Sequence, residues 1–305
     1  MIPGTLERRA IARSFARASA GYEAAATLQG MARTELLSRL AHFRLAPRVV
    51  LDLGAGTGAA APELRRRFPS SLVVAIDLAP AMLMQARNRL GPLERWWDWG
   101  RRRFSCVAGD ASRLPLADGS VDLVFTNLML QWCDDLDGAL AEIRRVLAPN
   151  GLLLCSTFAA GTLQQLRAAW AGIDAAPHVN DFVDLHDFGA ALVRAGFNEP
   201  VLDVDRHLRW YADTRALMTE IRSWGAVNAA RARRRGLTGR RQFAALEAAY
   251  QRQASPQGKL PASWELLYAS AFAAADPIDV TSAATEIPHE HAIPLGKIGR
   301  RGTPR

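Results

Sequence analysis

The stretch V49-V-L-D-L-G-A-G-T-G58 decides the fold of this 305-residue chain. A β-branched apolar run meets Asp52 and then three glycines spaced G-x-G-x-G, which is typical of a buried strand that runs into a tight turn. The helix expected over residues 58–68 would point its N-terminal N–H groups at the same turn, so the turn can bind a ligand. The spacing differs from the dinucleotide fingerprint G-x-G-x-x-G. The stretch could also be an ordinary tight turn.

Polar side chains follow the later strands that the sequence predicts. Asp77 closes the run S71-L-V-V-A-I-D77, where its carboxylate can accept hydrogen bonds from both hydroxyls of a ribose. Asp110 is placed to accept from the exocyclic amine of an adenine, and Asn127 to meet an ammonium group. Because the carboxyl ends of parallel strands meet at one crevice, these residues should lie together. The set predicts an adenosyl ligand, although Asp110 and Asn127 could instead cap local turns.

Alternating apolar runs predict an α/β fold with a mostly parallel sheet. Strands are expected over 48–53, 72–77, 104–108, 121–127, 151–157, 200–208 and within 264–275, and helices over 58–68, 80–90, 135–147, 162–175 and 186–195. We divide the chain into an N-terminal cap of two helices (1–45), the ligand-binding core (46–211), an inserted helical lid (212–258), the last core strand (259–275) and a flexible tail (276–305). Pro80 should lie one turn inside its helix, and Pro149-Asn150-Gly151 should end the third helix before the next strand.

The composition limits the class of protein. A hydrophobic content of 49% suits a large buried core. The chain has no run of 18 apolar residues and no apolar segment near its N-terminus, so we expect neither a membrane span nor a signal peptide, and a cytoplasmic location. Three scattered cysteines predict no metal site and no disulfide framework. A net charge of +8 favours an acidic partner, either protein or nucleic acid.

The combination D52-L-G-A-G-T-G58, Asp77, G109-D-A111 and Asn127 resembles the class I, Rossmann-like methyltransferases that use S-adenosylmethionine. The likeness covers about residues 48–158. It implies that S-adenosylmethionine is the cofactor and is bound by Asp52, Gly54, Ala55, Gly56, Gly58, Asp77, Leu78, Met82, Asp110, Ala111, Asn127 and Leu128.

A second resemblance runs over nearly the whole chain except its tail. It is carried by F15-A-R-A-S-A-G-Y22, N127-L-M-L-Q-W-C133, D174-A-A-P-H-V-N180, L217-M-T-E-I-R-S-W-G-A226, R235-G-L-T-G-R240 and G258-K-L-P-A-S-W-E-L-L-Y268. These segments are similar to the malonyl-acyl carrier protein O-methyltransferase family of biotin synthesis. The resemblance implies methylation of the free carboxylate of malonyl-acyl carrier protein or malonyl-CoA. The chain departs from the family pattern at residues 91–103, which look like an insertion with Trp96, Trp97 and Trp99, at Trp264, and at Ser223-Trp224.

A carboxylate acceptor is already ionised at neutral pH, so this reaction needs no catalytic triad, metal or general base. The residues expected to position the substrate are Tyr22, Gln131, Trp132, His178 and Arg222, with Arg222 as the cation that clamps the carboxylate. Each could instead have a purely structural place: a solvated helix arginine, a loop histidine, a core tryptophan or a tyrosine that packs between two helices.

The run A230-R-A-R-R-R-G-L-T-G-R-R241 could bind the acidic surface of an acyl carrier protein through Arg231, Arg233, Arg234, Arg235, Arg240 and Arg241, or could be a solvated face. The absence of a recognisable nucleic-acid module argues against an RNA partner. The tryptophans of 91–103 lie beside arginines in the sequence, however, so an RNA methyltransferase stays an alternative. The chain could also be a methyltransferase for another small acid or a quinone precursor, or a cofactor-binding assembly factor or hydroxylase of the same fold.

Overall fold

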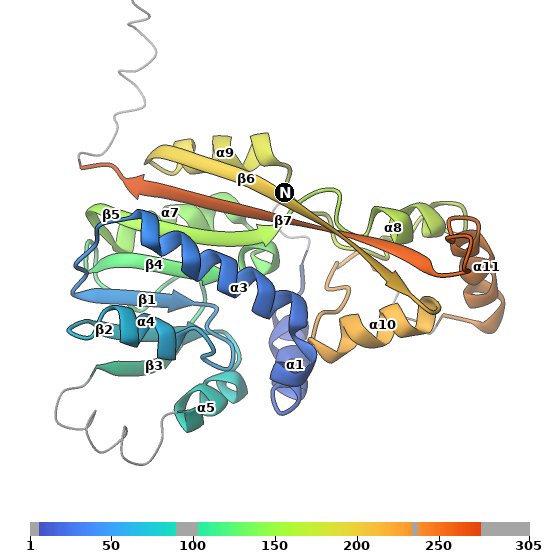
Figure 1. The fold of residues 1–305 in the computed structure, drawn as a ribbon, viewed down its shortest axis with the longest axis horizontal. Helices are drawn as coiled ribbons and strands as arrows, with labels where there is room; N and C mark the ends of the chain where they lie inside the picture. The colour runs from blue at the N-terminus through green and yellow to red at the C-terminus, as the bar shows by residue number, and fades with distance from the viewer. Residues whose placement is uncertain (1–5, 90–102, 234–235, 237, 276–305) are drawn as a thin grey trace, which may run out of the picture. The chain divides into compact units, whose positions relative to one another are not determined.

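A seven-stranded sheet forms the centre of the computed structural model, which describes residues 6–89, 103–233, 236 and 238–275 (Figure 1). The strands are β1 (Val49–Leu53), β2 (Leu72–Asp77), β3 (Phe104–Ala108), β4 (Val121–Asn127), β5 (Leu147–Phe158), β6 (Phe197–Tyr211) and β7 (Leu260–Ala273). Their order is β3-β2-β1-β4-β5-β7-β6; β1 to β5 pair in parallel, and β7 pairs antiparallel with β5 and β6. The chain order reverses between β1 and β4, which is where open α/β sheets bind ligands.

Helices cover both faces of the sheet because the strand side chains alternate between two apolar clusters. The α-helices are α1 (Arg8–Ala18), α2 (Tyr22–Ala25), α3 (Thr27–Arg39), α4 (Ala61–Arg67), α5 (Pro80–Arg89), α7 (Leu136–Val146), α8 (Gln164–Ala171), α9 (Leu185–Arg194), α10 (Thr214–Ser223) and α11 (Arg240–Gln251), with single 3₁₀ turns η1 (Leu40–His42) and η2 (Leu130–Trp132). Val50 packs in the same cluster as Leu36 of α3, whereas the neighbouring Leu51 packs with Ile143 of α7 and Phe188 of α9. The mostly parallel α/β sheet predicted from the sequence is confirmed.

The two C-terminal, antiparallel strands are the longest of the sheet, followed by β5 with 12 residues. β6 and β7 have 15 and 14 residues, and in Figure 1 they run past the parallel strands toward α8, α10 and α11. Since α10 and α11 lie between these two strands in the chain, both lie on the side of the carboxyl ends of the parallel strands: α10 extends toward α1, and α11 packs with α8 at the far end of the ribbon (Figure 1). None of the described helices is long and apolar enough to cross a bilayer.

Three local predictions were wrong. The Pro149-Asn150-Gly151 turn does not precede β5 but lies inside it: Asn150 has a φ of 61°, and the register against β4 shifts between Val121 and Leu123, so the extra residues form a bulge. α5 begins at Pro80 rather than one turn earlier, since the missing N–H costs nothing at a first helical position. The N-terminal part contains three helices instead of two, because Ala26 leaves the helical region with a ψ of 49° and separates α2 from α3.

Candidate active site

The glycine turn after β1 is shaped by packing as much as by any ligand. Gly54, Gly56 and Gly58 all have positive φ values of 70°, 54° and 72°, which favour glycine. A Cβ on Gly54 would lie 2.2 Å from Cγ of Met129, and one on Gly58 would lie 2.6 Å from Cβ of Ala86 in α5. A Cβ on Gly56 would meet nothing within 4 Å. Gly56 is therefore the glycine that keeps the ligand side of the turn open.

Two carboxylates, the half-buried Asp77 and the buried Asp52, lie behind this turn. Asp77 at the end of β2 accepts hydrogen bonds from the backbone N–H groups of Gly56 and Ala79, both at 2.8 Å. Burial raises its pKa, against these two hydrogen bonds, which lower it. Asp52 at the end of β1 is 3% exposed, and its Oδ2 has no hydrogen-bond partner in the described chain. Burial, and then the charge of Asp77, raise the pKa of Asp52 to about 7.

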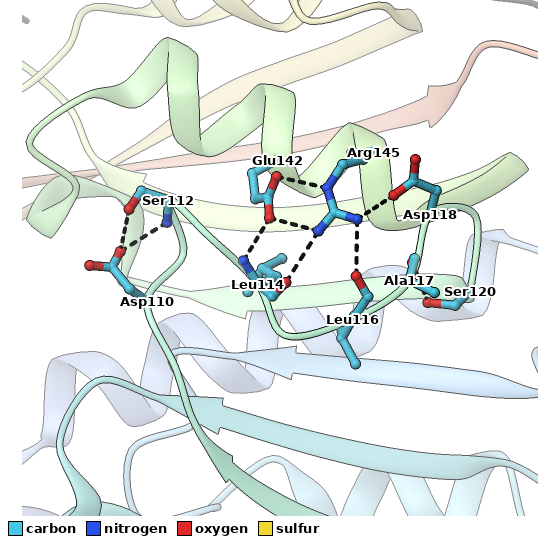
Figure 2. A network of polar contacts seen from close by, with 9 residues as sticks. All are labelled: Asp110, Ser112, Leu114, Leu116, Ala117, Asp118, Ser120, Glu142 and Arg145. Atoms are coloured by element: carbon cyan, nitrogen blue, oxygen red, sulfur yellow. Dashed lines mark hydrogen bonds and ion pairs between the residues drawn. The ribbon is translucent and has the colours of Figure 1, made fainter.

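The loop after β3 is held in place by α7. Figure 2 shows the Arg145 guanidinium among Glu142, Asp118 and the carbonyl groups of Leu114 and Leu116. Hydrogen bonding to Glu142 first, and then to Asp118, raises the pKa of Arg145. Asp110 begins the same loop, and its Oδ1 accepts from the backbone N–H and the hydroxyl of Ser112 (Figure 2). Arg145 thus fixes the loop that presents Asp110.

The N-terminal helices reach over this side of the sheet. Arg8 of α1 donates to Oδ2 of Asp110 at 2.9 Å and to the Ser112 hydroxyl at 3.1 Å. Glu23 of α2 forms an ion pair with Arg89 of α5 at 2.9 Å and accepts a hydrogen bond from the Thr57 hydroxyl of the glycine turn. No pattern in the sequence points to Arg8 or Glu23, because each acts through a partner that is distant in the chain.

These elements line a first cavity, open to solvent, of about 830 Å³ at the reversal of strand order. Of the predicted cofactor-binding residues, those that line it are Gly54, Gly56, Asp77, Leu78, Met82, Asp110, Ala111, Asn127 and Leu128. Asp52, Ala55 and Gly58 do not line it. Further lining residues, which the motifs of the sequence do not assign to the cofactor, include Arg8, Phe15, Met129 and Cys133.

A second cavity of about 700 Å³ adjoins the first. The two share Phe15, Tyr22, Leu128 and Trp132 in their linings. The walls of the second cavity are mostly apolar and come from the N-terminal helices, the segment after β5, the loop after α10, and β7; they include Gln29, Phe158, Leu166, His178, Ile221, Trp224 and Trp264. Two of the three departures from the family pattern meet here, since the rings of Trp224 and Trp264 are 5.1 Å apart.

Hydrogen bonds, from both backbone and side chains, join the walls of the second cavity. The loop after α10 pairs with the N-terminal segment at Leu6 and Ala230, and Ala229 donates its N–H to the Asn180 side chain. The indole N–H of Trp224 donates to the Ala25 carbonyl at 2.8 Å, which ties α10 to α2. The cover over the second cavity is therefore a single connected structure made of segments far apart in the sequence.

The predicted substrate residues fall into different places. Tyr22 and Trp132 lie at the boundary of the two cavities, and burial raises the pKa of the Tyr22 phenol, so it stays protonated. Gln131 lines the second cavity, but its amide is paired with the Leu128 carbonyl and the Thr157 hydroxyl. His178 also lines it and stacks on Trp170 at 3.5 Å. Arg222 is exposed and lines neither cavity, so its role as a clamp has no support from its position and stays a prediction.

Only some of the described arginines of the predicted basic face are free to bind a partner protein. Arg233 pairs with Glu7 at 2.9 Å, and Arg231 donates to the Leu6 carbonyl through Nε. Arg240 and Arg241 are exposed at the start of α11. Arg234 and Arg235, like the tryptophans of 91–103, lie outside the described residues.

The sheet order, the glycine turn and the acidic residue at the end of β2 are together those of a class I methyltransferase. A family model described as a methyltransferase domain matches residues 51–155. The chain is 46% identical to the malonyl-acyl carrier protein O-methyltransferase of Laribacter hongkongensis, over 85% of this chain and 87% of that protein. It is 44% identical to the enzyme of the same name from Xylella fastidiosa, over 88% of this chain and 89% of that protein.

The chain belongs to the malonyl-acyl carrier protein O-methyltransferase family. Among solved structures it resembles the YcgJ protein of Bacillus subtilis, with a TM-score of 0.55 and 16% identity, over 79% of this chain and 99% of that one, which shows the fold alone. As a member of this family the chain is an S-adenosylmethionine-dependent O-methyltransferase.

The first cavity fits that cofactor. Gly56 leaves open space beside the turn; behind it, outside the cavity lining, the Asp52 carboxylate is buried with an oxygen that lacks a partner within the described chain. Asp77 offers a carboxylate at the cavity wall. A cationic nucleoside bound beside Gly56 would bring positive charge to this carboxylate, and its ribose hydroxyls would add donors to the N–H groups of Gly56 and Ala79.

Proposed function

We propose that this enzyme transfers a methyl group to the free carboxylate of a malonyl thioester carried by acyl carrier protein, in the cytoplasm and for biotin synthesis. The observation that carries the proposal is the second, mostly apolar cavity that shares four lining residues with the cofactor cavity. A short acyl thioester fits an apolar cavity whose reactive end must meet the cofactor. Relatives at 46% and 44% identity carry the name of this activity.

The bound cofactor supplies an electrophilic methyl group. The chain contributes binding and orientation: the strand ends and the glycine turn hold the nucleoside, and Tyr22 and Trp132 form the boundary through which the acceptor oxygen must reach the methyl. Holding two reactants in line can contribute on the order of 7 to 11 kcal/mol to lowering the barrier. Phe158, Leu166, Trp224 and Trp264 exclude water from the carboxylate, whose nucleophilicity water would reduce.

Acyl carrier protein would dock through the exposed arginines Arg240 and Arg241 of α11, with Arg231 beside the N-terminal segment. Acidic helices of a carrier protein complement such a basic surface and associate faster with it at low salt. Replacing both Arg240 and Arg241 by Glu should raise KM for the protein-bound substrate but not for malonyl-CoA. An equal effect on both substrates would place the docking surface elsewhere.

The direct test incubates the purified protein with S-adenosylmethionine and malonyl-acyl carrier protein. We expect one added methyl group by mass spectrometry, removable by alkali as an ester, together with one S-adenosylhomocysteine per product. Malonamyl-acyl carrier protein, whose terminal amide replaces the carboxylate, is the matched control and should accept no methyl group. Cofactor binding without any product would overturn the proposed substrate and leave the fold and family unchanged.

A further inference from the structure

The second cavity offers an acceptor carboxylate no free cation among the residues that the structure describes. Of its described lining residues only His178 can carry a positive charge, and its Nε2 lies 2.6 Å from Oδ1 of Asp174. The remaining polar groups at the wall are neutral, and several are paired. The Asn228 amide donates to the Pro177 carbonyl and accepts from the Ala230 N–H.

Two lining side chains are different because each has a buried polar atom without a hydrogen-bond partner in the described chain: Oε1 of Gln29 and Nε1 of Trp264. Gln29 is the one that is hydrogen-bonded to a residue of the first cavity. It is 9% exposed, it lines the second cavity, and its Oε1 makes no hydrogen bond with any described residue. A buried oxygen left unpaired costs about 1 to 3 kcal/mol; because this oxygen is an acceptor, a carboxylate ligand recovers that free energy only when the amide is rotated so that its N–H₂ donors face the ligand. A rotated amide can present either its N–H₂ donors or its oxygen to a ligand.

The backbone of Gln29 is held firmly between the two cavities. Its carbonyl accepts a hydrogen bond from Nδ2 of Asn127 at 3.1 Å, and Oδ1 of Asn127 accepts from the Ser156 hydroxyl at 2.9 Å. Asn127 lines the first cavity, whereas Gln29 lines the second. A group bound by the Gln29 amide therefore lies next to the boundary at which the two reactants must meet.

Neutral donors also suit the chemistry. When a carboxylate attacks a sulfonium methyl, opposite charges of the reactants are lost in the transition state. A guanidinium would stabilise the charged reactant more than the transition state and so raise the barrier, whereas only interactions that are stronger in the transition state speed the reaction. A neutral amide can orient the carboxylate while stabilising the charged reactant less, so it raises the barrier less than a guanidinium would.

We propose that Gln29 is an acceptor-binding residue whose amide holds the carboxylate, and that the second cavity orients this anion with neutral donors instead of a cationic clamp. The inference rests on the proposed function, since it concerns the same acceptor. It assigns a role to a residue that the motifs of the sequence did not indicate.

The test compares Gln29→Met and Gln29→Glu with the same substitutions at Gln251, an exposed glutamine at the end of α11. With malonyl-acyl carrier protein, Gln29→Met should raise KM about tenfold, the loss of about one hydrogen bond to a charged group. Its Kd for S-adenosylhomocysteine, measured by calorimetry, should stay within about twofold of wild type, which a general loss of structure would not allow. Gln251→Met and Gln251→Glu should behave as wild type.

Gln29→Glu gives a readout that a structural role would not change. The introduced carboxylate repels the acceptor when it is ionised, whereas its protonated form donates a hydrogen bond as the amide does. The ratio of variant to wild-type kcat/KM should therefore rise as the pH falls from 8 to 5.5. A pH-independent ratio, or a wild-type KM in Gln29→Met, overturns the role of Gln29. If Gln29→Met does not fold, the pH series of Gln29→Glu decides. Failure of the wild-type enzyme to methylate the substrate would instead overturn the proposed function.

Discussion

The cofactor side and the acceptor side of this enzyme are built in different ways. The first cavity is formed largely by short segments that directly follow β1, β2, β3 and β4, so each polar residue has a fixed place relative to the sheet. The second cavity is formed by helices, loops and strand β7, from five distant parts of the chain. The first side therefore depends on backbone geometry and buried carboxylates, and the second on how its cover segments pack against one another.

The largest effect should come from Asp77 on the cofactor side. Asp77→Ala removes a wall carboxylate and leaves the N–H groups of Gly56 and Ala79 without their acceptor. We expect the affinity for S-adenosylmethionine, measured by calorimetry, to fall at least about 100-fold, because the two ribose hydroxyls of the cofactor lose their hydrogen bonds to a charged group. Asp77→Asn should lose less affinity for the cofactor than Asp77→Ala. An unchanged Kd in Asp77→Ala would contradict this placement of the ribose.

The glycines should separate packing from binding. Gly58→Ala puts a Cβ 3.0 Å from the Cα of Ala86, a backbone atom that cannot turn away, and should lower the free energy of unfolding by at least about 2 kcal/mol. Gly56→Ala has open space and should cost about 1 kcal/mol from its positive φ, but it should weaken cofactor binding. Denaturant unfolding and calorimetry on both variants check this. The reverse order of stabilities would refute the division of roles among the glycines.

Arg145 should connect stability to cofactor binding without touching the cofactor. Arg145→Met frees Glu142 and the loop that carries Asp110 (Figure 2). We expect about 1 to 3 kcal/mol lower stability and about a tenfold weaker affinity for S-adenosylmethionine, since a loosened loop must be ordered on binding. An unchanged Kd would mean that the loop holds its conformation without Arg145.

Asp52 should give the cofactor side a pH dependence. Its pKa of about 7 lies above the value in an unfolded chain, near 4, so between these values the folded protein keeps a proton that the unfolded chain has lost. Stability should therefore fall as the pH rises through this window, by on the order of 1 kcal/mol per pH unit from this group. Asp52→Asn removes this contribution, so its stability relative to wild type should be greater at pH 8 than at pH 5. An equal difference at both values would show that Asp52 does not titrate in this range.

Arg222 should give the smallest effect and tests the acceptor side. The sequence predicts it as the clamp, but its exposed position predicts that Arg222→Ala changes KM for the acceptor by less than about twofold. A large rise in KM with unchanged cofactor affinity would restore Arg222 as the clamp and weaken the case for Gln29.

The same contrast explains how much of the molecule could be predicted from its sequence. Apolar alternation and the G54-x-G-x-G58 spacing predict the sheet and most of the first cavity, because backbone geometry at strand ends is local. Arg8 reaches Asp110 across 102 residues, and Trp224 reaches Ala25 across 199, so no local pattern could reveal either contact. Gln29 belongs to no recognisable motif. Its importance lies in a buried oxygen without a partner in the described chain, which only a folded structure can reveal.

A crystal structure of the enzyme with S-adenosylhomocysteine and malonyl-pantetheine would test the arrangement of the two cavities most directly. We expect the nucleoside in the first cavity, the acyl group in the second, and the malonyl carboxylate within hydrogen-bond distance of the Gln29 amide and beside Tyr22. A carboxylate bound by an arginine instead, or an acyl group outside the second cavity, would contradict this arrangement.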